Sequence, residues 1–424
     1  MKRGGFGRYA TSIAGGEPVR AFVPPPLLPL PPLQFTGSVR TALDQALLAL
    51  GRLDGAAATL PDADLLLYTY VRKEAVLSSQ IEGTQSSLSD LLTHELGETP
   101  GVPVEDVAEV SRYVAAMAHG LERLKEGFPL SNRLLREMHG ILLAEGRGAQ
   151  KDPGEFRRSQ NWVGGTRPGN AAFVPPPPLE IESCMGDLER FLHSDTSTLV
   201  KVALAHVQFE TIHPFLDGNG RIGRLLITLL LCHEGTLRKP LLYSSLYFKE
   251  HRQDYYSQLN EVRETGDFER WIEFFALGIR VSAQQAALTG QRVFSVFQDD
   301  RNQLRKLGRL APTSLLVQEE MQKKPLATIA TLTKATGLTT PTVTQALREL
   351  ERLGIVRETT GRARGRVYAY VRYLEALNGE WGSWRRDCSA ERFRRWIIRI
   401  QFHLQKNQGS SRATPLTSSP SLSH

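Results

Sequence analysis

The 424-residue chain is predicted to be mainly α-helical, with a small β-hairpin in its middle and a helix-turn-helix plus hairpin near its end. Dense apolar residues with few Gly or Pro breaks predict long helices between about 37 and 290. A Gly- and Pro-rich stretch, 145–178, interrupts them and contains a Trp-Val pair before a glycine turn, which predicts a hairpin. After about 308, short helical patterns precede two strand-like segments around an arginine-rich turn.

The elements are expected in the following order. Residues 1–36 are rich in Gly and Pro and predict an extended arm. Ser131 is suited to cap a helix N-terminus. Helices are expected over Gly37–Leu53, Asp62–Ser79, Pro103–Glu126, Ser131–Leu143, Leu179–His193, Thr198–Thr211, Arg221–Leu231 and Phe248–Gly290.

This order predicts a division of the chain into four parts. Residues 1–110 form a Pro-rich arm followed by helices, and 111–290 form a helical core. Residues 308–372 hold the helix-turn-helix and hairpin. Residues 373–424 form a basic tail, which becomes rich in Ser, Thr and Pro after Gly409 and is predicted to be disordered there.

Composition predicts a cytoplasmic protein without a membrane partner. No apolar run reaches the ~18 residues that a membrane-spanning helix needs. Lys2 and Arg3 are not followed by the apolar segment of a secretory signal. An odd number of widely spaced cysteines favours neither a disulfide framework nor a zinc site: Cys184, Cys232 and Cys388. The net charge of +7 fits nucleic-acid contact or simple solubility.

The most informative stretch is His-Pro-Phe-Leu-Asp-Gly-Asn-Gly-Arg-Ile-Gly-Arg, residues 213–224. It lies between two apolar helical segments, so its turn leads into a helix N-terminus. Such a terminus carries unpaired N–H groups and a partial positive charge, which favour anions. Gly218 and Gly220 can adopt positive φ, which lets successive N–H groups point at one anion.

Charged side chains complete this site. Arg221 and Arg224 are three residues apart, so both project from nearly one helix face toward phosphate oxygens. Asp217 supplies one carboxylate, which is enough for Mg²⁺ when phosphates and water provide the remaining ligands. His213 has an ordinary pKa of about 6.5 and suits a general base. A calcium loop is excluded, because its first and twelfth positions would be Phe215 and Leu226.

At these positions the chain resembles the Fic family, whose signature is His-Pro-Phe-x-Asp/Glu-Gly-Asn-Gly-Arg-x-x-Arg. The resemblance implies a Fic-type helical bundle with a small β-hairpin flap, which transfers AMP from ATP to a protein hydroxyl. It implies that His213 deprotonates a target Ser, Thr or Tyr and that Asp217 holds Mg²⁺. The nucleotide-binding residues that it implies are Gly218, Asn219, Gly220, Arg221, Ile222, Gly223, Arg224 and Tyr255.

Two further stretches extend the resemblance. Residues 78–83 resemble the family's inhibitory motif, in which Glu82, on a segment beginning at Ser78, would pair with Arg224 and repel the γ-phosphate. Residues 160–170 resemble the family flap, which holds the target by main-chain hydrogen bonds. The flap residues that would do so are Val163, Gly164, Gly165 and Thr166.

The nucleoside end of the pocket departs from the pattern. Tyr255 and Tyr256 resemble a pair that lines this end in family members. Some relatives have an asparagine eight residues after the first tyrosine, where this chain has Arg263. Adenine contacts are therefore less well defined by the resemblance than phosphate contacts.

Residues 308–372 resemble a winged helix. Short helices are expected over 312–321, 328–335 and 341–353, with strands at 354–357 and 367–371. Polar residues at the start of the third helix and arginines in the wing suit DNA, although many winged helices bind protein instead. These residues are Thr340, Thr342, Thr344, Gln345, Arg362, Arg364 and Arg366.

The resemblance implies an autoinhibited protein adenylyltransferase that uses Mg-ATP and releases pyrophosphate. Its target hydroxyl would belong to another protein or to the chain itself. The alternatives are removal of AMP at the same site, a different donor (UMP, phosphate or phosphocholine), and a DNA-binding regulator with a nucleotide-sensing Fic body. A homodimer is left open.

Overall fold

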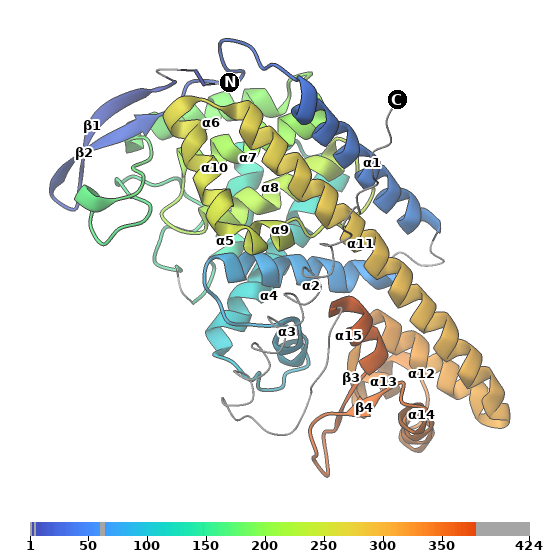
Figure 1. Cartoon of the computed structure of the whole chain (residues 1–424). Helices are drawn as coiled ribbons and strands as arrows, with labels where there is room; N and C mark the ends of the chain where they lie inside the picture. Colours follow the sequence, from blue (N-terminus) through green and yellow to red (C-terminus); the bar gives the residue numbers. More distant parts are fainter. Residues whose placement is uncertain (1, 4–5, 60–63, 147, 379–424) are drawn as a thin grey trace, which may run out of the picture. The chain divides into compact units, whose positions relative to one another are not determined.

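A computed structural model describes residues 2–3, 6–59, 64–146 and 148–378. The mainly helical prediction is confirmed (Figure 1). The N-terminal and central helices are α1 (Gly37–Thr59), α2 (Asp64–Ile81), α3 (Leu88–Glu95), α4 (Val104–Lys125), α5 (Asn132–Leu142), α6 (Pro178–Leu192), α7 (Thr198–Ile212), α8 (Asn219–His233), α9 (Ser245–Glu250), α10 (Arg252–Thr265) and α11 (Phe268–Leu304).

The core is built around α7 and α8, which pack against each other. Every residue of α7 from Leu199 to Ile212 is buried, which explains why its sequence is apolar on all sides instead of on one stripe. In α8 the run from Arg221 to Leu231 is also buried. Because both helices are enclosed, the loop between them is held at both ends.

Local sequence signals explain several helix starts. Ser131 caps α5 as predicted, since its Oγ accepts a hydrogen bond from the Leu134 N–H at 3.4 Å. Ser87 and Asp90 form a capping box at α3, a helix that the sequence reading missed because it is only eight residues long. The predicted helix 248–290 is instead α9, α10 and α11, separated near His251 and at Gly266.

The N-terminal segment forms a hairpin where an extended arm was expected. Strands β1 (Arg8–Ala14) and β2 (Glu17–Val23) pair antiparallel, with Arg8 opposite Val23 and Ala14 opposite Glu17. Gly15 and Gly16 form the two-residue loop, and both have positive φ. A Gly-Gly pair between strand-like segments is a hairpin signal, so this feature was readable in the sequence.

The flap is less regular than the predicted hairpin. One antiparallel bridge joins Val163 to Phe173, through N–H···O bonds of 2.8 and 3.1 Å. Between them lie two glycines with positive φ and the short 3-10 helix η1 (Pro168–Asn170). Proline at this turn cannot donate a ladder hydrogen bond, so paired strands do not extend further.

The C-terminal part is the predicted winged helix, with two additions. It contains η2 (Arg305–Leu310), α12 (Ala311–Lys323), β3 (Leu326–Thr328), α13 (Ile329–Thr336), α14 (Thr340–Arg352), β4 (Arg357–Glu358), β5 (Val367–Ala369) and α15 (Val371–Asn378). Its antiparallel sheet has the order β3-β5-β4. Strand β3 and helix α15 were not predicted, because each is too short to show a periodicity of its own.

Helix α11 continues beyond the predicted end of the helical core near Gly290 and reaches Leu304. Residues 1–380 cluster as one compact unit, so the winged helix packs on the rest of the described chain. Buried Asp300 of α11 accepts a 2.8 Å hydrogen bond from Tyr370 and pairs with Arg372. The predicted basic, disordered tail beyond Asn378, including Cys388, lies outside the described residues.

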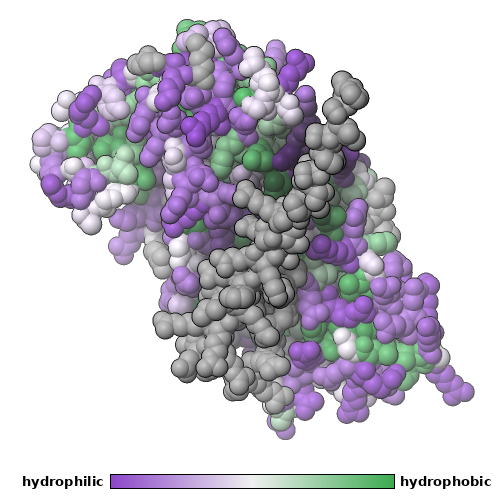
Figure 2. Space-filling view, viewed as in Figure 1, coloured by the Kyte–Doolittle hydropathy of each residue, from purple (hydrophilic) through white to green (hydrophobic). Residues whose placement is uncertain are grey.

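The described surface is mixed in character. On the face shown in Figure 2, hydrophilic residues predominate and hydrophobic residues are interspersed among them. None of the helices in the described ranges combines the length and apolar character needed to cross a bilayer.

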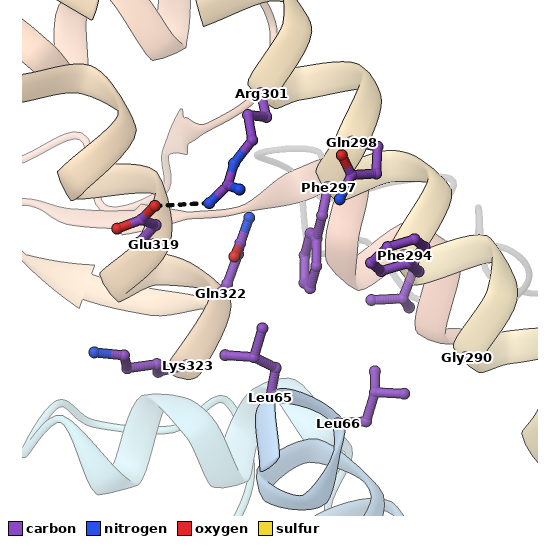
Figure 3. Close-up of a pocket in the computed structure, with 11 residues that line it drawn as sticks. Leu65, Leu66, Gly290, Phe294, Phe297, Gln298, Arg301, Glu319, Gln322 and Lys323 are labelled. Carbon is purple, nitrogen blue, oxygen red and sulfur yellow. Dashed lines mark hydrogen bonds and ion pairs between the residues drawn. The ribbon is translucent and has the colours of Figure 1, made fainter. Parts of the chain in front are cut away.

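A cavity of 260 Å³ lies where α2, α11 and α12 meet (Figure 3). Leu65, Leu66 and Phe297 are among its lining residues, and an ion pair of 2.7 Å between Arg301 and Glu319 borders it. The cavity contains none of residues 213–224, so it is separate from the site described next.

Candidate active site

The loop between α7 and α8 begins with a strained histidine. His213 ends α7 in the left-handed conformation, with φ 51° and ψ 59°, and its N–H still bonds to the Phe209 carbonyl at 2.9 Å. A non-glycine residue in this region costs about 1–3 kcal/mol and persists only where the surroundings hold it. The strain turns the imidazole out of the helical path toward the loop.

Asn219 holds the loop closed. Its Oδ1 accepts from the Phe215 N–H at 2.9 Å, and its Nδ2 donates to the Phe215 carbonyl at 2.8 Å. Phe215 is fully buried, so the bend is anchored in the core. Gly218 then starts α8 with φ 76°, and the free N–H groups of the first turn face the loop. Both features favour an anion at this helix end.

His139 of α5 supports Asp217 and was not found from the sequence. The Gly154 N–H donates to its Nδ1 at 2.8 Å, so its Nε2 carries the proton and donates to the Asp217 carbonyl at 3.0 Å. Its ring stacks on Phe215 at 3.7 Å. Burial lowers the pKa of His139 to about 4, so the ring is neutral. No local motif marks this histidine, because its partners come from two other segments.

Arg224 is paired with the predicted inhibitory residues. Its Nη2 lies 2.6 Å from Glu82 Oε1, its Nε donates to Ser78 Oγ at 2.8 Å, and Nη2 also donates to the Ser78 carbonyl at 3.1 Å. Arg224 is buried, whereas the Glu82 side chain is 36% exposed. Burial raises the pKa of Glu82, but Arg224 outweighs it and holds that pKa below its ordinary value. The pair is therefore ionised at neutral pH.

Arg221 is also held by acids. Its Nη1 lies 2.7 Å from Glu109 of α4, and its Nη2 lies 3.3 Å from Asp217. The Glu109 pair is buried on both sides. Glu109 was not predicted, because an acidic residue on an amphipathic helix gives no sign of a distant arginine.

Glycines at 220 and 223 leave room for carboxylates. A methyl group at Gly220 would overlap Glu82 Oε1, and one at Gly223 would overlap Glu210 Oε1. Glu210 is buried near the end of α7, and burial raises its pKa to about 7. Its Oε1 has no hydrogen-bond partner among the described residues. Ile222 lies between these glycines and is fully buried.

The two tyrosines of α10 have different environments. Tyr255 is buried, and its hydroxyl lies 2.9 Å from His206 Nε2, whose Nδ1 lies 2.8 Å from the Gly223 carbonyl. Tyr256 is 37% exposed. Tyr255 is thus linked to α8 through His206, and Tyr256 is the accessible ring of the pair.

The imidazole of His213 is neutral at physiological pH. Burial, then the nearby guanidinium groups of Arg263 and Arg157, lower its pKa to about 3. Arg157 also donates from Nε to the His213 carbonyl at 2.9 Å and from Nη2 to the Pro176 carbonyl at 2.6 Å. His213 Nδ1 is buried without a hydrogen-bond partner in the described structure. Nε2 is therefore the nitrogen left for chemistry in the loop.

Asp217 fits a phosphate-bound magnesium better than a protein-built metal cage. Its side chain is 37% exposed. The described residues contain no cluster of three His, Cys, Asp or Glu side chains that could hold a metal alone. Mg²⁺ commonly binds one or two carboxylates together with phosphates and water, so this single carboxylate suits it.

The flap lies beside this loop. Asn161 donates to the Phe215 carbonyl at 3.1 Å, which ties the start of the flap to the bend. Val163 is half-buried, and Gly164, Gly165 and Thr166 are exposed. The structure therefore brings His213, the glycine bend, both arginines, the predicted inhibitory residues and the flap into one region.

Comparison with known protein families agrees with this geometry. Residues 40–122 match the Fic/DOC family N-terminal model, and residues 129–231 match the Fic/DOC family model. The chain thus contains a Fic/DOC N-terminal domain and a Fic/DOC domain. Residues 313–357 match a family described as winged helix-turn-helix DNA-binding.

Individual Fic relatives cover part of the chain. It is 33% identical over 204 residues to protein adenylyltransferase Fic of Drosophila yakuba, covering 46% of this chain and 38% of that protein. It is 33% identical over 261 residues to the Aedes aegypti protein of the same name, covering 57% and 48%. The chain thus spans less than half the length of these curated relatives.

A solved structure shares the fold. A Fic family protein from Desulfovibrio desulfuricans G20 aligns with a TM-score of 0.52 and 22% identity. The alignment covers 80% of this chain and 98% of that one.

Proposed function

We propose that the protein is an autoinhibited adenylyltransferase, which transfers AMP from Mg-ATP to a Ser, Thr or Tyr hydroxyl of a target protein. The observation that carries this proposal is the α7–α8 joint. It combines a neutral imidazole, a glycine-lined helix N-terminus and a buried arginine occupied by Glu82. The names of the relatives support the same activity.

In the proposed reaction, His213 Nε2 accepts the proton of the target hydroxyl. The hydroxyl oxygen bonds to the α-phosphorus of ATP, the bond from that phosphorus to the bridging oxygen breaks, and pyrophosphate leaves. The lowered pKa keeps His213 unprotonated before the reaction, so it needs no prior deprotonation. The N–H groups of the first turn of α8 and Gly218 would face the phosphates.

Asp217 would hold Mg²⁺ against those phosphates, and the ion would neutralise charge on the departing pyrophosphate. His139 bonds to the Asp217 carbonyl and so fixes the backbone of Asp217. This sets the position from which the Asp217 side chain extends. Arg221 and Arg224 would bind outer phosphate oxygens.

Autoinhibition follows from competition for Arg224. A carboxylate 2.6 Å from its Nη2 occupies the position that a γ-phosphate oxygen would take. ATP must displace Glu82 from this buried arginine or bind without it. Ser78, on the same helix as Tyr70 and Glu74, adds two more hydrogen bonds that keep Arg224 turned toward α2.

The target segment would dock on the flap. Gly164 and Gly165 are exposed beyond the Val163–Phe173 bridge, so their main-chain groups face an added strand, whereas the N–H of exposed Thr166 already donates to Asn170 Oδ1 at 3.0 Å. Main-chain recognition tolerates many sequences. The target itself is therefore chosen by other contacts.

Mass spectrometry of the Glu82→Gly protein after incubation with Mg-ATP tests this function. We expect the intact mass to increase by one AMP per modified hydroxyl, and the wild type to show much less. The matched control is Glu82→Gly combined with His213→Ala, which should show no increase. No added AMP on the protein or on co-incubated lysate proteins would overturn the proposal.

A second proposed activity is DNA binding by the winged helix. Arg362, Arg364 and Arg366 are exposed in the wing, and Thr340 and Gln345 are exposed at the N-terminal half of α14. Such an arrangement suits a helix in the major groove and a wing on phosphates. The match to a DNA-binding winged-helix family supports it.

A further inference from the structure

Arg263 of α10 lies between the base and the flap, in a position that the proposed reaction does not otherwise use. Its guanidinium is almost completely buried and makes its contacts with three different segments. It stands where some relatives have an asparagine, so its contacts are particular to chains that carry arginine there.

The first set of contacts is with the end of α7. Arg263 Nη2 donates to the Glu210 carbonyl at 3.1 Å, and Nε lies 3.4 Å from Thr211 Oγ1. These groups precede His213 by two and three residues. The C-terminal end of a helix carries a partial negative charge, so a cation at this point stabilises the end that leads into the strained histidine.

The second contact is with the flap. The guanidinium carbon lies 3.9 Å from the centre of the Phe173 ring, within cation–π distance. Phe173 is the flap residue whose backbone pairs with Val163 in both directions. One side chain thus touches both the helix that ends at His213 and the flap on which a target would dock.

The third contact fixes the arginine itself. Nη1 donates to Asn260 Oδ1 at 2.9 Å, one turn earlier on α10. On the other side of His213, Arg157 holds its carbonyl, so two guanidinium groups enclose the end of α7. Arg157 bonds to the Ser159 and Pro176 carbonyls on either side of the flap, whereas Arg263 contacts Phe173 at the flap bridge itself.

We propose that Arg263 is a positioning residue for AMP transfer, which holds His213 and the flap at a fixed separation so that a docked hydroxyl meets the base. The proposal rests on the proposed function. A planar guanidinium is needed, because one face must cover Phe173 while the edge reaches two acceptors on α7. Lysine would keep the charge but not this geometry.

The test compares Arg263→Met and Arg263→Lys, each in the Glu82→Gly protein, with Arg270→Met as the matched exposed control. We expect Met to lower the rate of AMP incorporation by about 10–100-fold, because small misplacements of reacting groups have effects of this size. Lys should lower it by about 3–10-fold and Arg270→Met by less than twofold. The affinity for Mg-ATP, measured by calorimetry, should stay within about threefold for all three.

The pH dependence distinguishes positioning from general loss of structure. The charged groups that act on His213 are Arg263, Arg157 and Glu82, the last removed in the test protein. Removing a positive charge raises the pKa of the imidazole. Arg263→Met should therefore move the acidic limb of the pH–rate profile to higher pH. Arg263→Lys keeps the charge and should leave the acidic limb at the same pH. A general loosening of the fold would reduce the burial of the imidazole and shift this limb in both variants, so the readout is the difference between Arg263→Met and Arg263→Lys.

Amide hydrogen exchange supplies a readout that needs no activity. Peptides covering 160–175 and 205–215 should both exchange faster in Arg263→Met than in Arg270→Met, while α1 and α4 keep their protection. Unchanged exchange in the flap together with an unchanged rate would overturn the inference. If the Glu82→Gly protein itself incorporates no AMP, the proposed function has failed, and exchange alone then decides whether Arg263 links the two segments.

Discussion

Arginines at the α7–α8 joint and arginines in the wing share one chemistry but differ in environment. Arg221 and Arg224 are buried and paired with Glu109 and Glu82. In the wing, Arg362 is 53% exposed and pairs with Glu98, while Arg364 and Arg366 are exposed. A buried arginine is held in one geometry, and loss of its partner leaves an uncompensated buried charge, which costs free energy. It can therefore act as a switch. An exposed arginine is screened by salt and suits diffuse attraction to a polyanion.

The largest expected effect lies at the joint. His213→Ala should lower AMP incorporation by about 10²–10⁴-fold in the Glu82→Gly protein, because a general base is lost. The affinity for Mg-ATP should stay within about twofold, since the arginines and glycines remain. Calorimetry alongside the transfer assay measures both. Loss of ATP binding together with transfer would show that His213 shapes the pocket instead.

Glu82 and Glu98 provide a matched pair of acids. Glu82→Gln should raise AMP incorporation by about 10–100-fold, because it releases a buried arginine to the phosphates. Glu98→Gln should change it by less than twofold, because its partner Arg362 is 53% exposed and ion pairs with an exposed arginine contribute only about 0–1 kcal/mol. A radiolabelled ATP assay compares them. Equal effects of the two substitutions would mean that burial of the arginine partner does not decide whether an acid inhibits transfer.

Substitution of the wing arginines should weaken DNA binding and leave AMP transfer unchanged. Changing Arg362, Arg364 and Arg366 to Ala should weaken DNA binding by about 10-fold at 150 mM salt and lower the slope of log affinity against log salt by about 3. AMP incorporation should be unaffected. A gel shift at several salt concentrations measures this. DNA binding that ignores all three substitutions would remove the wing from the interface.

The smallest expected effect concerns stability. Burial raises the folded-state pKa of Glu210 to about 7, above its unfolded value, so its contribution is present below pH ~4.5 and is lost as pH rises through 7. Glu210→Gln should therefore stabilise the protein by about 1–3 kcal/mol at pH 8 and by less at pH 5. Denaturant unfolding at the two pH values checks this.

A stability gain for Glu210→Gln that is equal at pH 5 and pH 8 would contradict the assigned titration. It would place the effect in packing around Gly223 instead.

The sequence predicted features that are encoded locally. The positive φ of Gly218, the Ser131 cap and the winged helix could all be read from neighbouring residues, whereas Gly220 lies within α8 and lacks the positive φ expected of it. His139, Glu109 and Arg263 could not, because each acts through partners more than fifty residues away or on other helices. Short elements such as β3 and α15 were also missed, since a strand of three residues has no periodicity to detect.

Roles implied by family resemblance proved harder to assign to individual side chains. Asn219 was expected at the anion hole, yet both its amide atoms bind the Phe215 backbone. Tyr255 was expected at the nucleoside, yet its hydroxyl bonds to His206 in the interior. A motif identifies which residues matter, whereas only coordinates show which atoms remain free for a ligand.

Helix α11 serves two hydrophobic cores with one unbroken backbone. Its first half packs on α7 and α1, and its second half anchors the C-terminal module through Asp300. Melting either core would fray the same helix, so calorimetry should record a single transition for residues 1–380 instead of two. A truncation placed inside α11 to isolate the enzyme would expose apolar surface and produce an aggregating fragment.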